Sequence, residues 1–279
     1  MQIIDGRKIA SEIIANLKSE VDALPFQPVF CDILVGEDAV SAQYVNLKAK
    51  KAREAGMDFL NANFKAEIST EELMGEIKKL NSIPKMSGLI VQLPLPAALD
   101  RRKILDSIDS VIDVDCMGSQ RSEEFYAGNL EIVPPTAAAV MAMLDSLSLN
   151  LGNLRIVIIG KGELVGKPVR FLLEQKGLKV SVVDRGTQNP QEVMRAADVI
   201  ISATGRPKLV KGGMVKRGCI IIDAGTAEDK GQIVGDVDLE SVQSVEGFVS
   251  PVPGGVGPVT VACLLRNVLK VAQKLAIKK

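Results

Sequence analysis

The sequence predicts an α/β protein in which short, buried, parallel strands alternate with helices. Short aliphatic runs recur along the chain between segments of helical composition. Most of these runs are too apolar to have one face in water, which is typical of parallel strands covered by helices on both faces. In the middle of the chain, a glycine-rich segment lies between one such run and a helix, as in dinucleotide-binding folds.

The first third of the chain is predicted to contain two strands and two helices. Short apolar runs at residues 29–35 and 88–93 are bounded by glycine or proline, which is the pattern of buried strands. Residues 39–55 are rich in Ala, Lys and Glu, and residues 70–80 begin with a capping residue and two glutamates, so both segments are predicted helices. The order strand, helix, helix, strand indicates a parallel α/β unit.

The middle third begins a second α/β series with the most apolar run of the chain. Strands are predicted at residues 154–159, 179–183, 199–203 and 219–222, and helices at residues 137–147, 168–176 and 259–277. A chain of 279 residues with this organisation is long enough for two domains.

Composition and charge exclude several classes of partner. Lys plus Arg and Asp plus Glu both total 34, and no basic stripe carries aromatic residues, so nucleic-acid binding is not expected. The sequence has no apolar run of about 18 residues and no apolar N-terminal core, so neither a membrane span nor a signal peptide is predicted. Four separated cysteines argue against a disulfide framework or a zinc site and fit a reducing cytoplasm.

The chain contains no histidine. This excludes catalysis by a Ser-His or Cys-His pair and any metal site that depends on histidine. Acid–base chemistry must therefore come from Lys, Tyr, Asp, Glu or Cys side chains, and no metal is expected.

The segment after the predicted strand at residues 154–159 carries glycines at Gly160, Gly162 and Gly166. Glycines allow a tight turn and the close approach of a pyrophosphate, which then lies at the N-terminus of the next helix. The spacing is one residue longer than the commonest fingerprint, and a turn that needs glycines only for packing is the alternative. Asp184, at the end of the next predicted strand, favours nucleotide binding.

Several polar residues are candidates for the chemistry. Tyr44 and Lys48 are four residues apart on a predicted helix, so their side chains lie on one face; a solvated lysine beside a core tyrosine is the alternative. Gln92 lies in an aliphatic strand, where it needs a partner unless it is a satisfied core amide. Asp113 and Asp115 lie in a loop and could serve only a turn.

A second unusual segment covers residues 251–258, which read PVPGGVGP. Three glycines and three prolines in eight residues predict a stiff, shaped loop with exposed backbone donors. A structural turn could use fewer of them, whereas a loop that cradles a flat ligand gives a reason for all.

Together, these segments resemble the bifunctional methylenetetrahydrofolate dehydrogenase/cyclohydrolase family over nearly the whole chain. The most specific matches are residues 91–96 (VQLPLP) and 251–258, followed by Thr260. The spacing Ser41-x-x-Tyr44-x-x-x-Lys48 and the segment Asp113-Val114-Asp115 add to them.

The resemblance implies a two-domain α/β architecture. A small catalytic, folate-binding domain would comprise residues 1–143 and be completed by the C-terminal helix at residues 259–279. A Rossmann-like nucleotide-binding domain with a parallel sheet would comprise residues 144–258. The folate would lie in a cleft between the domains, and two copies would form a homodimer through the nucleotide-binding domains.

The resemblance also implies the reaction and the residues that perform it. The methylene group of 5,10-methylenetetrahydrofolate is oxidised with NAD or NADP, and water then converts the methenyl product to 10-formyltetrahydrofolate. Lys48 matches the catalytic lysine, Tyr44 the tyrosine that packs by the pterin, Gln92 the glutamine that binds the lysine, and Asp115 the acid that holds the pterin donors. The implied substrate-binding residues are Ser41, Tyr44, Asp115, Pro253, Gly254 and Gly255. The implied cofactor-binding residues are Gly160, Lys161, Gly162, Gly166, Asp184, Arg185, Thr204, Gly205, Gly225 and Thr226.

Cofactor choice can be compared with the same family. Members that use NADP typically have Gly-Arg-Ser after the first strand of the nucleotide domain and His-Ser at the end of the next. Here the two segments are Gly160-Lys161-Gly162 and Asp184-Arg185. A carboxylate at this strand end suits the ribose 2′-hydroxyl and repels a 2′-phosphate, so we expect a preference for NAD. Arg185 and Lys161 are positive charges that argue the other way.

Three alternatives stay open at this stage. The chain could be a dehydrogenase without the hydrolytic activity, since some relatives lack it. A shikimate-type dehydrogenase has a similar shape but gives Gln92 and the Pro253-Gly254-Gly255 segment no role. A non-catalytic nucleotide-binding relative is disfavoured by the intact set of Tyr44, Lys48, Gln92 and Asp115.

Overall fold

The computed structural model describes residues 1–229 and 232–277 and divides the chain into two compact units. The first, here called the large-sheet unit, contains residues 1–10 and 136–260. The second, the small-sheet unit, contains residues 11–135 and the chain from 261 onward. Each unit is therefore built from two separate stretches of the sequence, and each is described by itself.

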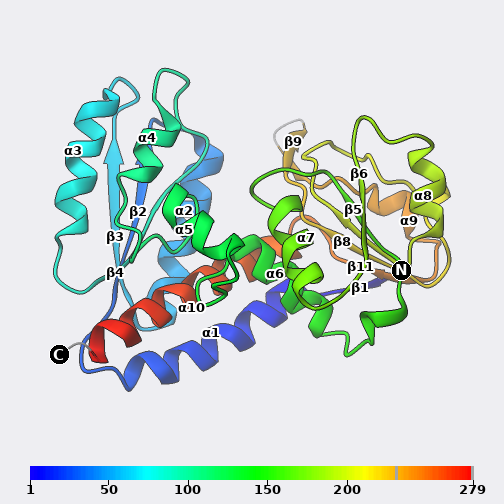
Figure 1. Cartoon of the computed structure of the whole chain (residues 1–279), viewed down its shortest axis with the longest axis horizontal. Helices are drawn as coiled ribbons and strands as arrows, with labels where there is room; N and C mark the ends of the chain where they lie inside the picture. Colours follow the sequence, from blue (N-terminus) through cyan, green and yellow to red (C-terminus); the bar gives the residue numbers. More distant parts are fainter. Residues whose placement is uncertain (230–231, 278–279) are drawn as a thin grey trace. The chain divides into compact units, whose positions relative to one another are not determined.

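The small-sheet unit contains a three-stranded parallel sheet in the order β3-β2-β4 (Figure 1). Its strands are β2 (Val29–Val35), β3 (Asp58–Phe64) and β4 (Met86–Val91). Its helices are most of α1 (Gly6–Asp22), α2 (Ala39–Glu54), α3 (Thr70–Asn81), α4 (Arg101–Asp106), α5 (Ser119–Tyr126) and most of α10 (Val256–Ile277).

The central strand β2 is buried along almost its whole length because β3 and β4 pair with its two edges. Helix α2 packs against β2 and β3 through buried Val45, Ala49 and Ala52. Helix α3 begins with a capping box in which Ser69 and Glu72 satisfy each other's backbone N–H groups, which fixes its first turn.

The large-sheet unit contains a six-stranded parallel sheet in the order β1-β11-β8-β7-β5-β6 (Figure 1). The strands are β1 (Gln2–Ile3), β5 (Ile156–Ile159), β6 (Val180–Val183), β7 (Val199–Ser202), β8 (Cys219–Asp223) and β11 (Gly247–Val249). The helices are α6 (Pro135–Asp145), α7 (Gly166–Gln175), α8 (Pro190–Ala196) and α9 (Leu239–Val242), and a separate hairpin joins β9 (Ala227–Asp229) to β10 (Gln232–Val234).

Strand order reverses around β5 in this sheet. The chain passes from β5 outward to β6 and then returns to β7 on the other side of β5. In open parallel sheets, ligands bind beyond the carboxyl ends of the strands at such a switch point. The glycine-rich segment that follows β5 lies at this point.

The α/β fold class predicted from the sequence is confirmed, as are the parallel strands of both halves. Besides the two-residue strand β1, two elements of the first third were not predicted. Strand β3 mixes exposed and partly buried residues and carries Asn61 and Asn63, so it lacks the continuous apolar run that marks β4 at the other edge of the sheet. Helix α1 carries its apolar residues at helical spacing, a signal that was present in the sequence.

The unit boundaries differ from the expected domain limits of 1–143 and 144–258. Residues 1–10 group with the large sheet because Gln2 and Ile3 pair in parallel with Phe248 and Val249. A two-residue strand is too short to predict from its own pattern. In the described part of the chain, every helix is too short or too polar to cross a lipid bilayer.

Candidate active site

The centre of the candidate site is the amino group of Lys48. Its Nζ donates a hydrogen bond to Gln92 Oε1 at 2.7 Å and lies 2.6 Å from Asp32 Oδ2. The side chains of Lys48 and Asp32 are 7% and 0% exposed, so this contact joins two charged groups in the interior. A buried charge pair of this kind is costly unless both partners are held in place.

Backbone structure positions each partner. Lys48 lies on α2, whose first turn is capped by Asp38 accepting from the Ser41 N–H at 2.7 Å. Gln92 follows β4, and its N–H donates to the Ile33 carbonyl, which continues the pairing of β4 with β2. The Gln92 amide N–H donates to the Leu93 carbonyl at 2.7 Å, which leaves its oxygen free to accept from Lys48.

Asp32 is a functional candidate that the sequence analysis missed. It lies in the middle of β2, where a carboxylate interrupts an otherwise apolar run. The same signal, a polar residue inside an apolar strand, had singled out Gln92. The sequence could not show that Asp32 and Gln92 approach the same lysine, because this depends on the pairing of β2 with β4.

Asp115 belongs to a loop organised by the buried carboxylate of Asp113. Asp113 accepts from the backbone N–H groups of Asp115, Met117 and Gly118, at 3.2, 3.5 and 2.8 Å. Part of Asp115 reaches the surface, yet its burial in the surrounding protein raises the pKa of its carboxyl group to about 6. The negative charge of Asp113 raises this pKa further, whereas the positive charge of Lys48 lowers it. Asp115 is therefore close enough to Lys48 for the two charges to interact.

The other predicted residues of this unit lie on the same helix as Lys48. Tyr44 is half-buried one turn before Lys48, and Ser41 is buried in the first turn. The structure thus brings Lys48 and Gln92 into contact, places Asp115 near them, and puts Tyr44 and Ser41 along the α2 face that leads to the lysine.

The glycine-rich loop of the large-sheet unit is shaped by two close approaches. A Cβ at Gly160 would lie 2.6 Å from the Ala203 carbonyl oxygen, and the residue has a φ of +96°. A Cβ at Gly166, the first residue of α7, would lie 2.2 Å from the Gly160 carbonyl oxygen. Gly162 has open space around it. The loop therefore closes tightly over the start of α7, a geometry that fits a pyrophosphate at a helix N-terminus.

Asp184 lies at the end of β6, in the position expected for a ribose contact. Its carboxylate accepts from the Gly186 N–H at 2.9 Å, so it also caps the following turn. Lys161 Nζ lies 2.7 Å from the other carboxylate oxygen, and this pair lowers the pKa of Asp184. Arg185 is exposed beside it.

The Thr204-Gly205 segment follows β7 and is held by the buried carboxylate of Asp236. The Gly225-Thr226 segment follows β8, and the Gly225 N–H donates to Asp223 Oδ1 at 3.0 Å. Asp236 accepts from the Thr204 N–H and hydroxyl group at 2.7 and 2.9 Å. Its carboxylate also occupies the space where Gly225 would carry a Cβ, with Oδ1 at 2.1 Å from that position. Glycine is thus required at position 225 for packing, a reason that the sequence analysis had not given.

The Pro253-Gly254-Gly255 segment lies in the large-sheet unit. Gly254 has a φ of +105°, and a Cβ at Gly255 would lie 2.5 Å from the Pro251 carbonyl oxygen. Gly6, at the start of α1, touches the Gly255 carbonyl so closely that a Cβ there would lie 1.8 Å from it. Packing alone therefore explains part of the glycine content of this loop.

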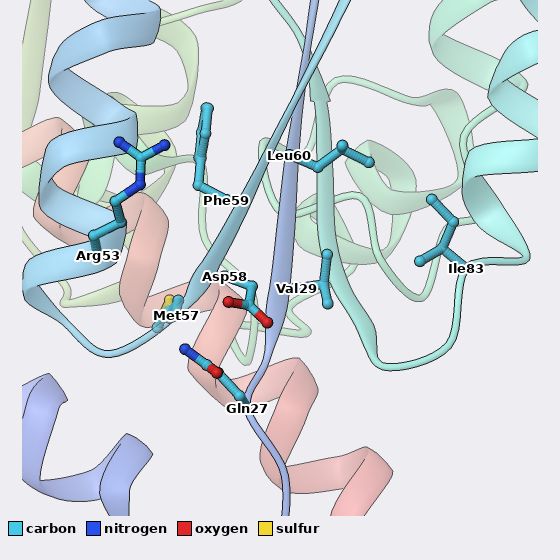
Figure 2. A pocket seen from close by; sticks show the side chains of 8 residues that line it. All are labelled: Gln27, Val29, Arg53, Met57, Asp58, Phe59, Leu60 and Ile83. Carbon is cyan, nitrogen blue, oxygen red and sulfur yellow. The ribbon is translucent and has the colours of Figure 1, made fainter.

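A hollow of about 600 Å³ lies elsewhere in the small-sheet unit (Figure 2). It is lined by Gln27, Val29, Arg53, Met57, Asp58, Phe59, Leu60 and Ile83. These residues surround the starts of β2 and β3, at the opposite ends of the strands from Gln92, and include none of the candidate site residues. We do not assign the chemistry to this hollow.

Two family profiles match the chain. The profile described as "Tetrahydrofolate dehydrogenase/cyclohydrolase, catalytic domain" matches residues 4–115. The profile described as "Tetrahydrofolate dehydrogenase/cyclohydrolase, NAD(P)-binding domain" matches residues 134–276.

Individual relatives match over nearly their full length. A protein of Hydrogenobaculum sp. named "Bifunctional protein FolD" is 39% identical over 272 residues, which cover 97% of this chain and 98% of the relative. The crystal structure of bifunctional FolD from Campylobacter jejuni is 35% identical, with a TM-score of 0.92 and 99% of each chain covered. The Trypanosoma brucei enzyme, solved with NADP and an inhibitor, is 34% identical with a TM-score of 0.92, covering 98% of this chain and 97% of that one.

Proposed function

This chain belongs to the tetrahydrofolate dehydrogenase/cyclohydrolase family, and from that premise we propose which residues perform its two reactions. The enzyme oxidises 5,10-methylenetetrahydrofolate to 5,10-methenyltetrahydrofolate with NAD(P)⁺ and hydrolyses the product to 10-formyltetrahydrofolate. The observation that carries the assignment of the chemistry is the buried Lys48 amino group held between Gln92 and Asp32.

In this proposal, the small-sheet unit binds the folate and the large-sheet unit binds the dinucleotide. When bound, the nicotinamide accepts the hydride from the methylene carbon. Lys48 moves protons during hydrolysis, and Gln92 fixes its amino group. Tyr44 packs beside the pterin and Asp115 accepts its N–H donors. Ser41, Pro253, Gly254 and Gly255 remain proposed substrate contacts.

The two activities can be tested with one assay. Purified protein is mixed with methylenetetrahydrofolate and NAD or NADP, and the reduced nicotinamide and the methenyl product are followed separately. Equal formation of both, followed by decay of the methenyl signal faster than in buffer, supports both activities. Accumulation of methenyl product without enzymatic decay would leave a dehydrogenase only.

Asp115→Ala should weaken folate binding far more than nucleotide binding. Each charge-assisted hydrogen bond lost from the pterin is worth about 1.5–3 kcal/mol, so we expect a roughly tenfold to hundredfold rise in the folate Kd. Because the pKa of Asp115 is about 6, wild-type affinity should also fall as the pH drops through that value and the carboxylate takes a proton. Isothermal titration calorimetry across this range measures both effects.

The matched control for that experiment is Glu123→Ala, which removes an exposed acid on α5 of the same unit. Its folate and nucleotide affinities should equal those of the wild type. An unchanged folate Kd in Asp115→Ala would count against the proposed pterin contact.

We propose that NAD is preferred over NADP. The support is the Asp184 carboxylate at the end of β6, which suits a ribose 2′-hydroxyl and repels a 2′-phosphate. Wild-type kcat/KM should be higher with NAD, and Asp184→Ser should shift the NAD/NADP ratio toward NADP by about tenfold, or about 1.4 kcal/mol. Asp198→Ser, which removes an acid paired with Lys216 elsewhere in the same unit, is the control. A wild-type preference for NADP would show that Asp184 does not select the cofactor.

We further propose that the protein acts as a homodimer joined through the large-sheet unit and that it works in the cytoplasm. The four cysteines are buried free thiols, which fits a reducing compartment. A light-scattering mass equal to two chains would support the dimer.

A further inference from the structure

Asp32 is the one acid in contact with Lys48 among the described residues, and its surroundings are unusual. It lies in the middle strand of the small sheet, opposite Asn61 on β3 and Ile90 on β4. Its side chain is fully buried, and its burial raises the pKa of the carboxyl group while Lys48 opposes the shift. Sheet positions of this kind are ordinarily filled by aliphatic side chains.

The Asp32 carboxylate has one ionic contact. Oδ2 lies 2.6 Å from Lys48 Nζ, and neither Oδ2 nor Oδ1, both of them buried, has a hydrogen-bond partner among the described residues. An isolated buried ion pair contributes little net stability compared with apolar residues of the same shape. A buried acceptor left without a partner is a further cost, so a reason other than stability is needed for Asp32.

We propose that Asp32 is a positioning residue for the hydrolytic reaction: it fixes the Lys48 amino group against Gln92 and is the counter-charge for the ammonium that forms there. This inference rests on the proposed function of Lys48. It assigns to Asp32 the part that a buried carboxylate plays behind a catalytic base, which it orients and whose protonated form it stabilises.

The counter-charge is needed because Lys48 carries a proton between two steps of the hydrolysis. Lys48 can accept a proton only as the neutral amine, which is therefore its reactive form. The water oxygen bonds to the methenyl carbon, and one water proton passes to the Lys48 nitrogen. The bond from that carbon to N5 then breaks, its electron pair stays on nitrogen, and N5 takes the proton from Lys48. The hydroxyl proton leaves as the formyl carbonyl forms, so one proton is released per turnover. Lys48 is an ammonium between the two transfers, and Asp32 balances its charge during that interval.

Two other titratable groups, Asp115 and Cys31, lie near the Lys48–Asp32 pair. Asp115 is near enough for Lys48 to lower its pKa and for Asp32 to raise it. Cys31, beside Asp32 on β2, has a pKa raised to about 12 by burial and by Asp32, so its thiol stays neutral. Gln92 carries no charge. Asp32 is therefore the carboxylate in direct contact with the lysine, and Asp115 is the second acid whose titration must be compared.

The test is the pH profile of methenyltetrahydrofolate hydrolysis in Asp32→Asn and Asp32→Val. Without the carboxylate, the positively charged state between the two proton transfers loses its counter-charge, so the rising limb of the pH profile of kcat should move toward lower pH. The plateau kcat should fall at least tenfold, because positioned acid–base groups contribute to the rate of the chemical step. The folate KM should stay within about threefold of the wild-type value, because Asp32 is not proposed to contact the substrate. Asp32→Asn buries an uncharged amide and could fail for that reason alone. Asp32→Val avoids this, because valine is apolar and a good strand former.

Cys31→Ser is the matched control because it places a polar group in the same strand on the opposite face. Its melting temperature reports the cost of disturbing β2, and its pH limb should coincide with that of the wild type. Wild-type limbs and plateaus in both Asp32 variants would overturn the role of Asp32 and leave the proposed function intact. A wild-type enzyme that does not hydrolyse methenyltetrahydrofolate would overturn the proposed function and this inference together.

Discussion

Replacing Lys48 with methionine should reduce the hydrolysis of methenyltetrahydrofolate by about 10²–10⁴-fold, the range for loss of a positioned acid–base group. Methionine keeps most of the length and apolar character of the side chain but cannot donate to Gln92 Oε1 or carry a proton. Stopped-flow decay of the methenyl absorbance measures the loss. Oxidation of methylenetetrahydrofolate should decline less, because the nicotinamide takes the hydride.

The Lys48→Met variant also leaves the Asp32 carboxylate buried without its partner. Breaking a buried pair in this way costs about 3–5 kcal/mol, part of which Asp32 can avoid by taking a proton. The double variant Lys48→Met/Asp32→Val removes both charges and should recover most of the lost melting temperature. It should not recover hydrolysis, which separates a catalytic defect from a folding defect.

Lys51→Met is the surface control for both variants. Lys51 lies on the same helix but pairs with Glu54 in a partly exposed contact at 2.6 Å, and such pairs are worth little. Its activity and stability should be close to those of the wild type. Full hydrolytic activity in Lys48→Met would mean that another residue moves the protons.

The sequence was most informative where burial is strongest. The strands that became β2, β4, β5, β7 and β8 could be predicted because they are buried and most of their positions are apolar. Strand β3 could not, because it exposes every second or third residue and carries Asn61 and Asn63. Strand β1 consists of two residues, and only its pairing with β11 identifies it.

In the candidate site, too, the sequence predicts relations within one helix but not contacts between strands. Lys48 and Tyr44 could be related by helical spacing alone, since both lie on α2. The contact of Lys48 with Gln92 and Asp32 depends on sheet register, because Gln92 follows β4 while Asp32 lies on its neighbour β2. A buried acid in an apolar strand is visible in the sequence, but the sequence alone does not identify its partner.

Structure also separates two glycines of the glycine-rich loop after β5 that look equivalent in the sequence. A Cβ at Gly166 would lie 2.2 Å from the Gly160 carbonyl oxygen and 2.9 Å from its carbon, both backbone atoms that cannot rotate away. A Cβ at Gly162 would meet nothing within 4 Å, and Gly162 has no left-handed φ. Of these two glycines, Gly166 is therefore the one that the loop needs in order to close over the start of α7.

Gly166→Ala should consequently reduce kcat/KM of the dehydrogenase for the dinucleotide by about 10²-fold, since a shift of about 1 Å in a positioning segment has effects of that size. Overpacking should also lower the free energy of unfolding by about 1–3 kcal/mol. Gly162→Ala should retain nearly wild-type stability, and its dinucleotide KM should change by much less. Hydrolysis of methenyltetrahydrofolate, which requires no hydride acceptor, should persist in Gly166→Ala at temperatures where the variant is folded.

The measurements are dehydrogenase kinetics with varied dinucleotide, hydrolysis of added methenyltetrahydrofolate, and thermal melts of the wild type and the two glycine variants. Equal losses in the two variants would show that the loop contacts seen here do not govern dinucleotide binding. Parallel loss of both activities in Gly166→Ala would show that the substitution acts through global unfolding.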